Sequence, residues 1–122
     1  MIDIHTHILP EIDDGAASLD EAYEMALMAA RSGVKAVIAT PHSNQRIDFG
    51  EAERRQQERV FRELKQVLIQ ENVPLRLYHG MEIWSSIDMV EKIKSGKLIT
   101  LNRTPYVLIE FAFHEEPWWI EA

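Results

Sequence analysis

The sequence of 122 residues contains no cysteine, and this absence excludes several kinds of chemistry. A chain without cysteine forms no disulfide, offers no thiolate to a metal ion and has no sulfur nucleophile for covalent catalysis. Any metal site in this chain must therefore be built from nitrogen and oxygen ligands.

Basic residues and long apolar runs are also scarce. Thirteen lysines and arginines stand against 20 acidic residues, which gives a formal net charge of −7. This charge opposes general attraction to nucleic acid or to an anionic membrane surface. No stretch approaches the roughly 18 apolar residues of a membrane helix, and no signal peptide is recognisable. We expect one globular cytoplasmic unit over residues 1–122, with no membrane span and no nucleic-acid partner.

Short apolar segments alternate with helical patterns along the chain. Ser18 and Glu21 have the spacing of a capping box, and Gly33 follows the last periodic position of the first helix. The order β-α-β-α-β-α-β is typical of an α/β fold with parallel strands, either an open sheet or part of a barrel. We expect strands over 1–7, 34–40, 75–79 and 106–111, helices over 19–32, 51–71 and about 87–95, and a brief extended segment over 98–101.

The segment 1–7 places two imidazoles two residues apart at the end of an apolar alternation. Alternate residues of a strand share a face, so we expect His5 and His7 to project together. Ile2 and Ile4 would then project the opposite way into an apolar layer. Neutral imidazole is a common metal ligand. Histidines that are merely hydrogen-bonded are the alternative, but two in register before an acidic turn favour a metal site.

Other candidate ligands come at or just after the ends of the predicted strands. Because the carboxyl ends of parallel strands meet at one rim, residues far apart in sequence are expected to converge there. A single carboxylate at a strand end would mean little, but several together favour a site. The candidate metal ligands are His5, His7, Asp14, His42, Glu82 and Glu110.

The motifs that carry these residues resemble those of a known family. They are His5-Thr6-His7, Asp13-Asp14-Gly15, Thr40-Pro41-His42, Gly80-Met81-Glu82-Ile83 and Leu108-Ile109-Glu110-Phe111. Their spacing resembles the amino-terminal half of the polymerase-and-histidinol-phosphatase (PHP) superfamily. More narrowly, it is similar to the bacterial manganese-dependent protein-tyrosine phosphatases that act on tyrosine kinases regulating capsular and exopolysaccharide synthesis.

The resemblance implies half of a distorted TIM-like barrel with a trinuclear metal centre. The two histidines of the first motif would bind one ion, which Glu82 would bridge to a second. Glu110 would bind this second ion, and Asp14 with His42 would bind the third. The donor set favours Mn²⁺, with Zn²⁺ or Fe as alternatives. A metal-activated water would hydrolyse the phosphotyrosine of a protein, in that family a bacterial tyrosine kinase.

Family members run to roughly twice this length, as expected of a complete barrel. Later ligands of that family and its phosphate-binding arginines have no counterpart in these residues. We therefore expect an incomplete metal site, and exposed strand edges that lead to self-association.

Two further residues are candidates for substrate binding. Arg46 follows His42 and could reach a phosphate, and Trp84 follows Glu82 and could line a pocket for an aromatic ring. We interpret His79 as a packing or hydrogen-bonding residue rather than a ligand. Two alternative functions stay open: another phosphoesterase of the superfamily, such as a histidinol phosphatase, or a non-catalytic metal-binding or interaction domain.

Overall fold

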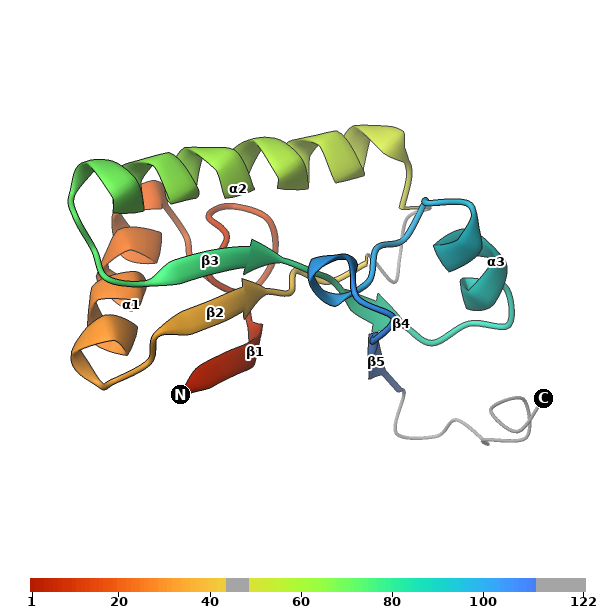
Figure 1. The fold of residues 1–122 in the computed structure, drawn as a ribbon. Helices are drawn as coiled ribbons and strands as arrows, with labels where there is room; N and C mark the ends of the chain where they lie inside the picture. Colours follow the sequence, from red (N-terminus) through yellow and green to blue (C-terminus); the bar gives the residue numbers. More distant parts are fainter. Residues whose placement is uncertain (44–48, 112–122) are drawn as a thin grey trace.

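The computed structural model describes residues 1–43 and 49–111 (Figure 1). Its elements, in chain order, are β1 (Ile2–Thr6), α1 (Leu19–Arg31), β2 (Ala36–Ala39), α2 (Glu51–Gln70), β3 (Arg76–His79), β4 (Glu82–Trp84), α3 (Met89–Lys94), the 3₁₀ helix η1 (Leu101–Arg103) and β5 (Leu108–Glu110). The predicted α/β class with parallel strands is confirmed.

The strands form two small sheets rather than one. One sheet has the order β1-β2-β3, and the other pairs β4 with β5. A single bridge between His42 and Glu82 joins them, and the hydrogen bonds from Gly80 N to Ala39 O and from Glu82 N to Pro41 O continue the pairing across the break. The prediction of one strand before Glu82 is therefore corrected: Glu82 begins β4 (Figure 1).

The chain passes close to its neighbours at Gly80, between β3 and β4. A Cβ atom at this position would lie 2.9 Å from side-chain atoms of both Ile38 and Leu101, so a larger residue would require these side chains to shift. The predicted brief extended segment 98–101 is only partly present: no strand forms there and Leu101 begins η1, but the backbone of Thr100 is extended. Consecutive positive φ angles at Asn102 (48°) and Arg103 (59°) turn the chain away from a strand conformation.

The two long helices pack on the three-stranded sheet and form the main core with it. Ser18 caps α1 by accepting a hydrogen bond from Glu21 N at 3.1 Å, as the capping-box spacing predicts. The main hydrophobic cluster joins α1, α2, β2 and β3 with the loop after β1, and a smaller one surrounds Met81, Ile83 and Leu98 near α3. Among the described residues, no helix combines the length and apolar character needed to cross a bilayer.

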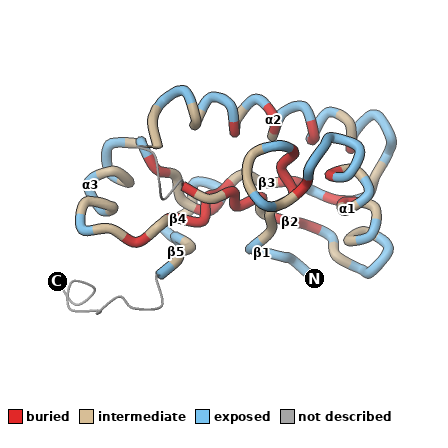
Figure 2. Tube along the Cα trace, turned by 180° about the vertical axis from the view of Figure 1, so that it is seen from behind, coloured by how far each residue is buried: buried red, intermediate tan, exposed pale blue. Residues whose placement is uncertain are grey.

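The exposure of the edge strand β1 differs from the prediction. Ile2 and Ile4 are 65% and 53% exposed, so the expected apolar layer over them is wrong for this structure. In the described structure β1 has a strand neighbour on one side only, and most of the strand is coloured as exposed in Figure 2. The core begins just beyond the strand, at the buried Ile8 and Leu9. β1 thus holds its place through pairing with β2 rather than through side-chain burial.

His79 is a packing residue, as predicted. Its ring stacks on Phe61 of α2 with the centroids 4.9 Å apart, and its Nε2 atom is buried without a hydrogen-bond partner in the described part of the chain. Burial lowers the pKa of His79 below its ordinary value of 6.5, although the charge of Glu58 acts in the opposite direction.

This lowered pKa predicts a loss of stability in mild acid. Between the folded-state pKa and 6.5, the unfolded chain binds a proton at His79 that the folded chain does not, so the free energy of unfolding falls as the pH drops below 6.5. We expect His79→Leu to lose less stability than the wild type between pH 8 and pH 5.5. Urea unfolding at both pH values measures the difference, and identical losses in the two proteins would contradict the assignment.

Candidate metal centre

The ends of the parallel strands bring six distant side chains to one place. Residues Thr6 and Ala39 are in register between β1 and β2, and the His42–Glu82 bridge extends the alignment to β4. The pairing of β4 with β5 then sets Trp84 beside Glu110. The strand pairing and the loop after β1 together gather the six predicted ligands, which are His5, His7, Asp14, His42, Glu82 and Glu110.

Glu82 lies at the centre of the cluster and is only 8% exposed. Its Oε2 atom lies 3.1 Å from Nε2 of His5, 3.0 Å from Nε2 of His7 and 3.3 Å from Nδ1 of His42. Yet this buried oxygen has no hydrogen bond of acceptable geometry from any described residue. A buried carboxylate oxygen in this state is costly unless a cation neutralises it.

The spacing of these atoms fits a shared cation. Two ligand atoms that each lie about 2.0–2.2 Å from one ion are about 2.8–3.6 Å apart. The distances around Glu82 Oε2 fall within this interval, as does the 3.2 Å between Nε2 of His5 and Nε2 of His7. The donor set is all nitrogen and oxygen, which suits divalent transition metals.

The described residues contain three groups whose potential ligand atoms lie within 4.8 Å of one another. Every predicted ligand belongs to at least one group, and neighbouring groups share a residue. The groups are His7, Asp13, Asp14 and His42; His5, His7 and Glu82; and His42, Glu82 and Glu110.

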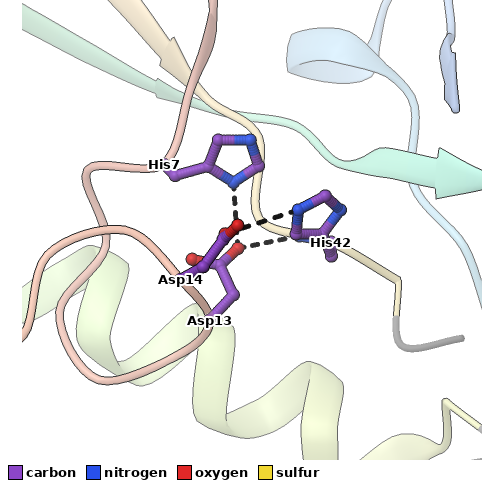
Figure 3. Close-up of side chains that lie close together, drawn as sticks. All are labelled: His7, Asp13, Asp14 and His42. Atoms are coloured by element: carbon purple, nitrogen blue, oxygen red, sulfur yellow. Dashed lines mark hydrogen bonds and ion pairs between the residues drawn. The ribbon is translucent and has the colours of Figure 1, made fainter. Parts of the chain in front are cut away.

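Asp13 is the residue that the sequence interpretation missed. One oxygen, Oδ2, lies 3.0 Å from Nδ1 of His7 and accepts a hydrogen bond from the backbone N of His42 at 3.1 Å (Figure 3). Its other oxygen accepts from Gly15 N at 3.0 Å, which closes a tight turn. In the sequence, the aspartate two residues before a glycine is the pattern that predicts this turn. Asp14, by contrast, is 80% exposed and lies 3.5 Å from Nε2 of His42.

Gly15 allows this turn to lie against the first histidine motif. A Cβ atom at Gly15 would overlap the carbonyl oxygen and the Cβ of His7. The same carbonyl accepts a hydrogen bond from Ala16 N at 3.1 Å. The loop after β1 therefore folds back on itself and carries both aspartates to the histidines.

The electrostatics of His7 and Asp13 are coupled. Burial by itself lowers the pKa of His7, but the hydrogen bond with Asp13 and the charges of Asp13, Glu82 and Asp14 outweigh it and raise this pKa. For Asp13, burial acts to raise the pKa, and hydrogen bonds from His7 and from the backbone of His42 and Gly15 lower it overall. Asp13 is thus an ionised acceptor that keeps a proton on Nδ1 of His7 and directs Nε2 toward Glu82.

His42 belongs to two of the three groups of potential ligands. Its ring stacks on that of His7 with centroids 4.5 Å apart, and its Nδ1 lies 3.0 Å from Oε2 of Glu110. Of the two predicted substrate-binding residues, Arg46 lies outside the described residues, and Trp84 ends β4.

Comparison with known proteins assigns the chain to a family. The profile described as "Capsular polysaccharide synthesis, CpsB/CapC" matches residues 1–122. The chain therefore belongs to the CpsB/CapC family, as the motif resemblance implies.

The chain is also similar to individual proteins that are named as tyrosine-protein phosphatases. The chain is 39% identical over 121 residues to the tyrosine-protein phosphatase YwqE of Bacillus subtilis, covering 99% of this chain and 47% of YwqE. It is 34% identical over 119 residues to the putative tyrosine-protein phosphatase CapC of Staphylococcus aureus, covering 98% and 46%. With the tyrosine-protein phosphatase CpsB of Streptococcus pneumoniae it shares 32% identity over 114 residues, covering 93% and 46%.

A solved structure shares the fold. This structure is one of the crystal structures of YwqE from Bacillus subtilis and CpsB from Streptococcus pneumoniae, which are described as "unique metal-dependent tyrosine phosphatases". The superposition has a TM-score of 0.87 at 39% identity and covers 99% of this chain and 48% of that one. The chain thus spans about half the length of the relatives it matches.

The hydrogen bond between Asp13 and His7 predicts that replacing Asp13 weakens metal binding through the orientation of His7. Replacing Asp13 with Asn removes the charge that orients His7, and such partners of a metal-binding histidine contribute about 10- to 100-fold in affinity. We expect Asp13→Asn to weaken Mn²⁺ binding by about this factor in calorimetric titration. The exposed Glu24→Gln on α1 is the matched control, and equal affinities for both variants would refute the orienting role.

Proposed function

We propose that this chain binds divalent cations at the cluster around Glu82. The single observation that carries the proposal is the buried Glu82 Oε2, which faces three imidazole nitrogens at 3.0–3.3 Å without a hydrogen bond from a described residue. The three overlapping groups of ligand atoms support more than one ion. The proposed ligands are His5, His7, Asp14, His42, Glu82 and Glu110.

We propose Mn²⁺ as the resident metal. The ligand set contains three imidazoles, three carboxylates and no sulfur. The share of carboxylates favours Mn²⁺, whereas structural Zn²⁺ is typically bound at sulfur-rich sites. Zn²⁺ and Fe are the alternatives, and metal analysis distinguishes them.

The proposed activity is hydrolysis of phosphotyrosine in a protein. Relatives named tyrosine-protein phosphatases support this substrate, and the shared fold at a TM-score of 0.87 supports a shared site. When bound, the ions supply Lewis acidity, which offsets phosphate charge and lowers the pKa of a water. The local positive field would also let a chain of net charge −7 accept an anionic ester.

The protein's own residues would prepare this chemistry. His5 approaches Glu82 from β1 and His7 from the loop that follows it. His42 approaches Glu82 from the segment after β2 and also contacts Glu110 at the end of β5. Asp13 holds the ring of His7 through Nδ1. Because these contacts come from separate elements of a paired sheet, the ligands are positioned before a cation binds.

The proposed biological substrate is a bacterial tyrosine kinase that regulates capsular or exopolysaccharide synthesis. The family's description as capsular polysaccharide synthesis proteins supports this setting. A cytoplasmic location follows from the proposal, because a kinase that uses ATP forms its phosphotyrosine there.

Glu82 should be the most sensitive position for metal content. Glu82→Gln keeps the shape of the side chain but removes the charge that faces three imidazoles, so we expect most of the bound manganese to be lost after dialysis. Elemental analysis measures the ratio of metal to protein, with His79→Ala as the control outside the cluster. An equal loss in the two variants would contradict the central place of Glu82.

The substrate class is tested by comparing three phosphate esters. With Mn²⁺, we expect phosphate release from a phosphotyrosine peptide to exceed release from histidinol phosphate or from a nucleotide end. Chelator should abolish it, and thiol reagents should have no effect because the chain has no cysteine. A preference for either other ester would assign the chain to another phosphoesterase, and chelator-resistant release would exclude a metal mechanism.

We also propose that the chain self-associates. Ile2 and Ile4 of β1 and the preceding Met1 are exposed, and the outer edge of β1 has no strand partner in the described structure. Light scattering coupled to size exclusion at micromolar concentration should detect dimers or larger species. Ile4→Lys should shift the population toward the monomer, and a wild-type protein that is entirely monomeric would contradict this proposal.

A further inference from the structure

Trp84 is a large aromatic residue that takes no part in either hydrophobic cluster of the described residues. It is half-buried at the end of β4, and the smaller cluster around Met81, Ile83 and Leu98 does not include it. Core packing therefore does not account for its place in the fold.

The strand geometry places Trp84 on the face that carries the metal ligands. Residues 82 and 84 of a strand share a face, so Trp84 projects with Glu82. Ile83 projects the other way and is fully buried in the smaller cluster. The register of β4 with β5 sets Trp84 directly beside Glu110, whose Oε2 lies 3.0 Å from Nδ1 of His42.

The position of Trp84 is held by its backbone. Its N–H donates to Oγ of Ser43 at 2.8 Å, and Ser43 N donates to Glu82 O at 2.9 Å. This pair of bonds ties the end of β4 to the residue that follows His42. The indole is thus attached to the same rigid frame as the metal ligands.

We infer that Trp84 is a specificity-determining residue that selects an aromatic phosphate ester over an aliphatic one. This inference rests on the proposed phosphotyrosine chemistry and names the part of the substrate that Trp84 contacts. In phosphotyrosine the ring is bonded directly to the ester oxygen, so a side chain beside the phosphate meets the ring. In phosphoserine a single methylene occupies that place, and an indole has no ring to contact.

Equilibrium binding tests the inference without requiring turnover. Two labelled peptides are compared by fluorescence anisotropy in the presence of Mn²⁺, one with a non-hydrolysable difluorophosphonate analogue of phosphotyrosine and one with that of phosphoserine. We expect Trp84→Leu to raise the Kd of the aromatic peptide by about three- to tenfold relative to the aliphatic one. Trp84→Phe should retain most of the selectivity, and the exposed Ile87→Ala, three residues along the chain, serves as control.

The outcomes separate this inference from the proposed function. If the wild type binds both peptides and Trp84→Leu changes both Kd values equally, or neither, the inference is overturned while the phosphate site stands. If the wild type binds neither peptide with Mn²⁺, the proposed function fails for this chain and the inference fails with it. A selective loss in Trp84→Leu together with retention in Trp84→Phe supports the inference.

Discussion

The arrangement around Glu82 is the constraint on which the site depends. A carboxylate oxygen that is buried, faces three imidazole nitrogens and receives no hydrogen bond from a described residue is unfavourable in a protein interior. Divalent cations would neutralise this buried charge, because the carboxylate oxygen and the imidazole nitrogens that face it would act as ligands. The rest of the fold can be understood as the frame that brings His5 and His7 from the end of β1 and the loop that follows it, and His42 from the segment after β2, to this one oxygen.

The core and the candidate site occupy different parts of the fold. Two helices and the three-stranded sheet form the main core. The candidate site lies outside this core, where the sheet β1-β2-β3 meets the two-stranded sheet of β4 and β5. The break at Gly80 and Met81 separates the packing part of the third strand from the part that carries Glu82. His79 and Glu82, only three residues apart, therefore have different surroundings: His79 stacks on Phe61 of α2, and Glu82 faces three imidazoles.

Much of this organisation could be predicted from the sequence, because strand ends are marked locally. The two-residue spacing of His5 and His7, and the positions of His42 and Glu110 at strand ends, follow from periodicity and parallel topology. Asp13 was missed because its role depends on a turn that folds back onto His7. The exposure of Ile2 and Ile4 was also missed, since alternation shows that a strand has two faces but not what covers each.

The most direct test of the account is a crystal structure of the protein grown with Mn²⁺, with anomalous diffraction collected at the manganese absorption edge. The account predicts an anomalous peak in contact with Glu82 Oε2 and with at least two of the imidazoles that face it, and the loss of that peak in Glu82→Gln. Well-ordered crystals with no peak at Glu82, or with manganese bound only elsewhere, would contradict the central claim.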